Sequence, residues 1–251
     1  MSISIVRRMD STRQGLIEQI AERHVQTYLD EFSKNVVEDV HLDIDELYQS
    51  SIYPEHELIL VRHRDLGFVG KEKVLGQTLP AKRIICIDRS VASPALDKRS
   101  SFTYAHEFGH GILHSGKKKL YRSGDRHQLS GPGVSRHEIE ANQFAAALLM
   151  PRVLVHLLFR WTFDCEPPLY YKGPGLYTVC ARGRDHQAVV KSYSDYCLAY
   201  AGFMNTRFFS VSKTSLALRL SNLGMLRTTK DEIFDVNQPT WWYQAKLDST
   251  A

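Results

Sequence analysis

The sequence has few cysteines, and their spacing is irregular. Cys86, Cys165, Cys180 and Cys197 lack the Cys-x-x-Cys spacing of common metal and redox motifs, so we expect reduced and mostly buried thiols. Cys86 lies within a strand pattern and is expected in the core. A metal site formed by Cys165, Cys180, His186 and Cys197 is the alternative, which the irregular spacing disfavours.

The sequence also lacks any run of about 18 apolar residues, and residues 1–8 have no long apolar core of the kind found in signal peptides. We therefore expect neither export nor a membrane span, which leaves the cytoplasm as the default compartment. A formal net charge of +4 over 251 residues does not by itself indicate a nucleic-acid-binding protein. The hydrophobic content of 43% is enough for one large domain, or one domain with an appendage.

The most informative feature that is present is the segment His106-Glu107-Phe108-Gly109-His110. On a helix, two histidines four residues apart lie on the same face and can bind one metal ion. Glu107, beside the first histidine, is placed to accept a proton from a water that zinc has made more acidic. Apolar neighbours indicate a core helix, with Asp97 or Ser100 at its start and Gly116 at its end.

A catalytic zinc needs a third protein ligand, and a second helix ending at Met150-Pro151 offers two candidates, Glu138 and Glu140. Asn142 lies four residues after Glu138, on the same helix face, where it could hydrogen-bond a metal ligand. We therefore assign Glu138 as the ligand and Asn142 as its neighbouring hydrogen-bonding group. The alternative is that Ser135 and Glu138 form a capping box, in which Glu138 only satisfies the helix end.

The run from Phe102 to His110, together with the pattern from Glu138 to Pro151, resembles the ImmA/IrrE metallopeptidases over about residues 82–160. The resemblance implies a zincin-like fold of the two-His-one-Glu (gluzincin) kind. His106, His110 and Glu138 would be its Zn²⁺ ligands and Glu107 its catalytic base. It also implies a cytoplasmic protease that cleaves a helix-turn-helix repressor, with roles in transcription regulation and stress response.

We expect an α+β fold in which a zincin-like metallopeptidase domain spans residues 1–160. Leu16, Ile20, His24, Tyr28 and Leu29 recur at helical spacing, and Asp10, Ser11 or Thr12 could cap that helix. Residues 43–48 indicate a second short helix. Apolar runs at 57–62, around 68–69 and at 82–88 predict the strands of a small sheet that packs on the two metal-bearing helices. In zincins a strand near the metal helix binds substrate by edge pairing.

Residues 161–202 form an aromatic-rich insertion that is longer than the resemblance leads us to expect. A helix after Pro151 has one apolar face, with Val153, Leu154, Leu157, Leu158 and Trp161. Residues 176–181 predict a strand, and Asp185 predicts the start of a helix that carries Tyr193, Tyr196, Cys197 and Tyr200. Core packing is the preferred interpretation of Tyr170, Tyr171 and Tyr177, and a role as oxyanion donor near the metal is the alternative.

Residues 203–251 predict a C-terminal helical hairpin similar to a helix-turn-helix, with Ser212 as an N-cap and Gly224 as a stop. Its second helix offers few base-reading side chains beyond Lys213, Arg219 and Asn222, so we favour protein docking over direct DNA binding. Trp241-Trp242-Tyr243 lies in a tail that either folds back or frays.

The loop at 115–134 is a second departure from the family. It is basic, with Lys117, Lys118, Lys119, Arg122, Arg126 and His127, and is interpreted as a solvated loop near the cleft rim. The function predicted is a zinc-dependent endopeptidase with a protein substrate, and no feature specifies an oligomeric state. The alternatives are a non-proteolytic zincin-like module that binds a regulator, and a toxin-antitoxin or phage effector.

Overall fold

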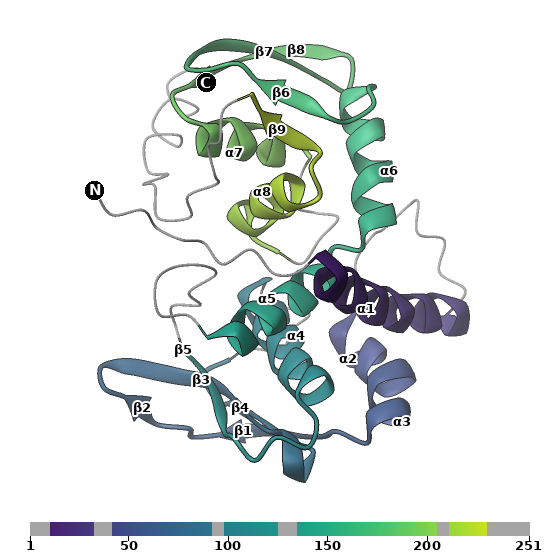
Figure 1. The fold of residues 1–251 in the computed structure, drawn as a ribbon, viewed down its shortest axis with the longest axis vertical. Coiled ribbons are helices and arrows are strands. Elements are labelled where there is room, and N and C mark those ends of the chain that lie inside the picture. The colour runs from purple at the N-terminus through teal and green to yellow at the C-terminus, as the bar shows by residue number, and fades with distance from the viewer. Residues whose placement is uncertain (1–10, 33–41, 92–97, 125–134, 205–210, 230–251) are drawn as a thin grey trace.

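The computed structural model describes residues 11–32, 42–91, 98–124, 135–204 and 211–229. In chain order its elements are α1 (Ser11–Phe32), α2 (Ile44–Leu47), η1 (Tyr48–Ile52), α3 (Tyr53–His56), β1 (Ile59–Arg64), β2 (Phe68–Val69), β3 (Glu72–Leu79), η2 (Pro80–Lys82), β4 (Ile84–Asp88), α4 (Lys98–Leu113), β5 (Tyr121–Gly124), α5 (Arg136–Leu149), α6 (Arg152–Phe163), β6 (Leu169–Tyr171), β7 (Gly175–Ala181), β8 (Arg184–Val190), α7 (Tyr193–Phe203), α8 (Lys213–Asn222) and β9 (Leu226–Thr228). Figure 1 shows the sheet of β1–β5 below α4 and α5, with α1–α3 to one side. From there α6 leads to a second group of elements, β6–β9 with α7 and α8. The expected mixed α+β class, with a small sheet and packed helices, is confirmed.

The sheet has the order β1-β4-β3-β2, and β5 also pairs with β3. β1 and β4 are parallel, whereas β3 is antiparallel to β4 and to β5. The strands predicted at 57–62, 68–69 and 82–88 are confirmed, but β3 and β5 were not predicted. β3 alternates charged, polar and apolar residues around a glycine, and β5 has four residues whose only strand partner in the described chain lies more than 40 positions earlier. Neither strand has the continuous apolar run from which the other strands were predicted.

The two motif helices, α4 and α5, pack closely at Gly109. A Cβ added there would lie 3.1 Å from the backbone of Ala141, so the absent side chain lets the two helices approach. α5 begins after Ser135, whose hydroxyl accepts a hydrogen bond from the Glu138 backbone N–H at 3.3 Å. It ends at Met150, before Pro151, as predicted. The expected start of α4 at Asp97 lies outside the described residues.

The helix predicted here is confirmed as α1, and its predicted face is buried in part. His24 and Tyr28 are fully buried and Ile20 and Leu29 pack against the core, whereas the side chain of Leu16 is 45% exposed. The buried face also includes Ile17, Ala21 and Val25. The predicted caps, Asp10, Ser11 and Thr12, lie outside the residues whose side chains are described. The short helix expected at 43–48 is confirmed as α2, and it continues through the π-helical turn η1 into α3.

In the second group of elements, the helix predicted to start at Asp185 is wrong in its first part. The strand predicted at 176–181 is confirmed as β7, but residues 184–190 form the antiparallel strand β8 rather than a helix. Along β8, Ala188 and Val190 are buried and Val189 is exposed, which is the two-residue period of a strand. A helix begins only at Tyr193, where the side chain of Ser192 caps α7.

The predicted face of α6 is also corrected. Leu154 and Leu158 are buried together with Val155 and Phe159, but Val153, Leu157 and Trp161 are exposed. The buried face therefore lies about one residue further along the helix than the sequence pattern indicated. The predicted helix itself is confirmed.

The second helix of the predicted C-terminal hairpin is present as α8, with Ser212 as its cap and Gly224 at a φ of 68° after its end. Residues 205–210, which contain part of the first predicted helix, lie outside the described chain, as do Arg126, His127 and the tail with Trp241-Trp242-Tyr243. The helix-turn-helix assignment stays a prediction. Arg219 is buried and pairs with Glu18 of α1 at 2.5 Å, so this candidate base-reading side chain is engaged inside the protein.

All four cysteines are free thiols; Cys197 is buried and Cys180 is exposed. Cys86 lies in β4, as its strand pattern predicted, but it is only partly buried. No single described helix combines the length and apolarity of a membrane span; α5 and α6, bent by 55° at their junction, meet that test only as a pair.

Candidate metal centre

The structure brings together three side chains from the two motif helices. His106 and His110 lie one turn apart on α4, and Glu138 reaches them from the first turn of α5. The Nε2 atoms of the histidines are 3.1 Å apart, and the Glu138 oxygens lie 3.2 Å from Nε2 of His106 and 3.4 Å from Nε2 of His110. Tetrahedral zinc with bonds of about 2.0–2.1 Å separates its ligand atoms by about 3.3 Å. These three side chains therefore fit one divalent ion.

The electrostatics of the cluster favour a cation. Burial lowers the pKa of His110 to about 4, so this imidazole is neutral near pH 7. Partial burial opposes ionisation of Glu138, but its hydrogen bonds with His106 and His110 hold the pKa of its carboxyl well below the usual range. Burial also disfavours the charged form of His106, yet contact with Glu138 and the charge of Glu107 raise its pKa. An arriving ion would replace that proton on His106.

Both interpretations of Glu138 describe part of what the structure contains. Its backbone N–H donates to Ser135, as in a capping box, while its carboxylate contacts the two imidazoles. Glu140 instead contacts Nε2 of His114 at 3.2 Å and pairs with Arg13. The structure thus separates the two candidate acids, with Glu138 at the histidine pair and Glu140 away from it.

Glu107 is fully buried between α4 and the sheet. Its carboxylate accepts hydrogen bonds from Thr78 of β3, at 2.5 Å, and from Ser123 of β5. A Cβ added to Gly76 of β3 would lie 2.7 Å from Cγ and Cδ of Glu107, so the absence of a side chain there makes room for the acid. Burial is the main reason that the pKa of Glu107 is raised, which suits a group that exchanges protons near neutral pH.

The other ring nitrogen of each histidine also has a partner. Nδ1 of His106 lies 2.8 Å from Oδ1 of Asn142, the contact expected for this asparagine. Nδ1 of His110 lies 3.1 Å from Nδ1 of His114, and the ring of Tyr121 stacks on His110 with centroids 4.2 Å apart. Such contacts fix ring orientation and decide which nitrogen faces a metal.

Sequence reasoning missed five residues around this site, Gly76, Thr78, His114, Tyr121 and Ser123. Only His114 had a local signal, because it follows His110 by four residues on the same helix face. The other four come from β3 and β5, neither of which was predicted.

The alternative candidates do not gather at this site. Tyr171 is buried among the aromatic rings of Tyr177, Tyr193 and Tyr196 in the second group of elements. Within the described chain, neither of the two groups that could hold a metal includes a cysteine or His186.

The fold and the cluster thus define a mixed α+β protein with a candidate metal centre between two helices and a buried acid beside it. Residues 55–160 match the family model of the IrrE N-terminal-like domain, Peptidase_M78. This match confirms the resemblance to the ImmA/IrrE family over that part of the chain, from α3 to α6, and suggests metallopeptidase activity. A search of curated proteins found no match to the chain.

Proposed function

We propose that this protein is a zinc-dependent endopeptidase of the gluzincin kind. The observation that carries the proposal is the position of Glu138, whose carboxylate contacts both imidazoles of the motif while Glu107 lies buried next to them. His106, His110 and Glu138 would hold the ion, and Asn142 would orient His106. Bound zinc supplies a Lewis acid that polarises the substrate carbonyl and makes water more acidic.

Glu107 is the proposed general base. Its carboxylate would accept a proton from the attacking water and then return it to the leaving amide nitrogen. Thr78 and Ser123 hold that carboxylate in one orientation, and Gly76 leaves the space that it occupies. The raised pKa of Glu107 supports both halves of this exchange, because the group must take up and release a proton within one cycle.

The outer edge of β5 is the proposed substrate-binding edge. β5 pairs with β3 along one side and has no strand partner on the other side among the described residues. Ser123 on this strand contacts Glu107, so a peptide added along β5 would run beside the proposed base. Exposed Lys118, Lys119 and Arg122 lie just before or on this edge and favour an acidic peptide segment.

By resemblance, we propose that the substrate is a helix-turn-helix repressor and that cleavage derepresses its genes, which places the reaction in the cytoplasm. The test is to incubate the purified full chain with the helix-turn-helix regulator encoded beside it, with Zn²⁺ or with a chelator, and to identify fragments by mass spectrometry. Discrete products that disappear with the chelator are expected. Intact regulator that co-migrates with the protein would instead support a non-proteolytic binding module.

A further inference from the structure

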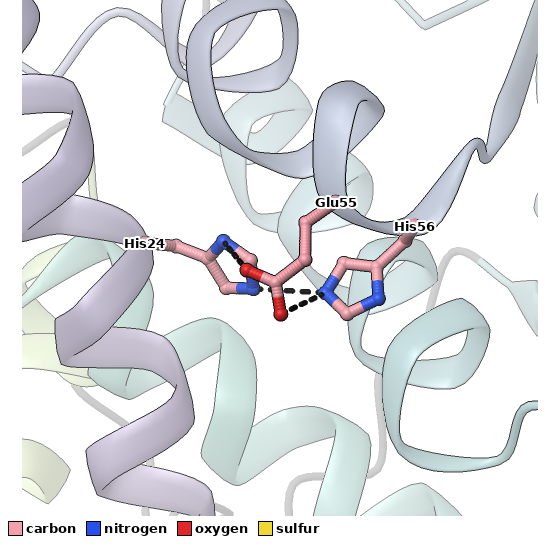
Figure 2. A group of neighbouring side chains, drawn as sticks. All are labelled: His24, Glu55 and His56. Atoms are coloured by element: carbon pink, nitrogen blue, oxygen red, sulfur yellow. Dashed lines mark hydrogen bonds and ion pairs between the residues drawn. The ribbon is translucent and has the colours of Figure 1, made fainter.

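A second cluster of two histidines and one glutamate lies away from the motif helices. Figure 2 shows His24 of α1 facing Glu55 and His56 at the end of α3. The Nε2 atoms of His24 and His56 are 3.1 Å apart, and Oε1 of Glu55 lies 3.5 Å from Nε2 of His56. One ligand atom from each residue can be chosen so that all three lie within 4.8 Å of one another.

The facing histidines of this cluster repeat the spacing of the candidate metal centre, but the carboxylate is placed differently. Glu138 contacts both facing Nε2 atoms, whereas Glu55 contacts Nε2 of His56 and lies 4.0 Å from Nδ1 of His24. In both clusters two Nε2 atoms face each other at 3.1 Å, close to the separation of about 3.3 Å between two ligands of tetrahedral zinc. In both, a side-chain oxygen contacts Nδ1 of the buried histidine. For His24 this oxygen is the hydroxyl of Ser51, at 2.7 Å. If Nδ1 donates its proton to Ser51, the lone pair on Nε2 points toward His56.

The cluster is also open enough for an ion to enter. The side chain of His24 is buried, but those of His56 and Glu55 are 22% and 42% exposed. Burial lowers the pKa of His24 to about 3 and also lowers that of His56, so both imidazoles are neutral near pH 7. Neutral imidazole is the form that binds metal, and Zn²⁺ is among the ions that it suits.

Without an ion, the cluster is held by contacts among its own side chains and with Ser51 and Arg23. Arg23 pairs with Oε1 of Glu55 at 2.5 Å, and an N–H···N hydrogen bond can join the two histidines. The arginine pair is solvent-exposed at both ends, so it contributes little stability and is easily exchanged. A bound ion would displace both contacts, because it would use the same Nε2 and carboxylate atoms.

We propose that His24, Glu55 and His56 form a second site for a divalent transition ion of the Zn²⁺ class, which joins α1 to α3. Since α1 also packs along α5, the ion would hold this helix against the domain that carries the first cluster. His24 lies outside residues 55–160, so this site joins the family-matched segment to a helix that precedes it. The proposal does not depend on proteolytic activity.

The test counts bound zinc in the full chain after chelator treatment, by equilibrium dialysis and elemental analysis. The background is the double variant His106→Ala, His110→Ala, which removes the first cluster. We expect two Zn²⁺ per wild-type chain and one per background chain. In that background, Glu55→Gln or His56→Ala should weaken the remaining binding at least tenfold, and the matched control His156→Ala should leave it unchanged.

A background chain that is folded by circular dichroism but binds no zinc overturns the proposal, as does zinc that persists after His56→Ala. If the background does not fold, the single variant His56→Ala in the otherwise unchanged chain decides the question. A fall from two ions to one supports the second site, and no change in stoichiometry overturns it. In the His106→Ala, His110→Ala background, Glu55→Gln or His56→Ala should also abolish the visible absorption of bound Co²⁺.

Discussion

The two His-His-Glu clusters of this protein have the same side chains and the same separation between their histidines, but different surroundings. In each, two Nε2 atoms lie 3.1 Å apart with a carboxylate within 3.5 Å of at least one of them. Around His106 and His110 the neighbours are a fully buried acid and an asparagine. Around His24 and His56 they are a serine hydroxyl and an arginine.

The difference separates metal binding from metal-assisted chemistry. Three donors are enough to bind an ion, but hydrolysis also needs a group that exchanges a proton with water. Glu107 is the group that we propose for this exchange, because burial raises its pKa while Thr78 and Ser123 hold its carboxylate. In the Glu55 cluster the charged neighbour is Arg23, which pairs with the carboxylate and cannot act as a base. We therefore propose catalysis for the first cluster, and for the second a structural role that joins α1 to α3.

The largest effect is expected from Glu107→Gln, which should lower cleavage about 10²–10⁴-fold because the amide cannot accept the proton. Zinc should remain bound, since the three ligands are untouched, whereas His110→Ala should lose both zinc and cleavage. Glu55→Gln is the matched control in the second cluster and should cleave normally. The measurements are the rate of regulator cleavage and the zinc content of each variant. Normal cleavage by Glu107→Gln would overturn both the mechanism and the distinction between the two clusters.

A smaller effect is expected from Gly76→Ala. The added Cβ would come within 2.7 Å of the Glu107 side chain, so the acid must move while His106, His110 and Glu138 keep their places. A displacement of about 1 Å at a reacting group costs about 10²-fold in rate. We expect kcat to fall by about that factor with zinc content unchanged, as measured by steady-state cleavage and elemental analysis.

Gly175→Ala is the control for this substitution, because an added Cβ at Gly175 has no neighbour within 4 Å among the described residues. It should leave kcat unchanged. An unaltered kcat in Gly76→Ala would show that the position of Glu107 does not limit the reaction.

The parts of the site that were predictable from sequence are those carried on single helices. His106, Glu107 and His110 follow from one turn of helix, and Asn142 was placed by its four-residue spacing from Glu138. His114 follows His110 at the same spacing. Its contact with Glu140 accounts for the direction of that side chain. These relations depend only on helical periodicity, which is readable locally.

The parts that were not predictable depend on pairing between distant segments. Thr78 and Ser123 meet Glu107 because β3 and β5 pair across more than 40 residues. Neither short segment alone determines the register of this pairing. The second cluster was missed for a related reason. His24 and His56 meet only because α1 packs against η1 and α3, and a buried histidine in a helix pattern gives no signal for its partner.

The error at β8 has a different cause. Val189 and Tyr193 are four residues apart, which fits a helix as well as the observed strand, and the two-residue turn before β8 is decisive only once β7 is paired.

The smallest effect concerns the pH dependence of stability in the metal-free protein. The pKa of His24 is about 3 in the fold, against 6.5 as its ordinary value, because the ring is buried beside His56 and Arg23. The unfolded chain therefore binds a proton before the folded chain does, so the contribution of neutral His24 is complete above about pH 6.5 and is lost as pH falls toward 3. At most about 1.4 kcal/mol per pH unit of the unfolding free energy belongs to this one group. His24→Gln should flatten the slope measured by denaturant unfolding between pH 6 and about pH 4.5. If the His24→Gln slope equals that of the wild type, the imidazole is not held neutral by the fold, and the likeness between the two clusters is limited to their geometry.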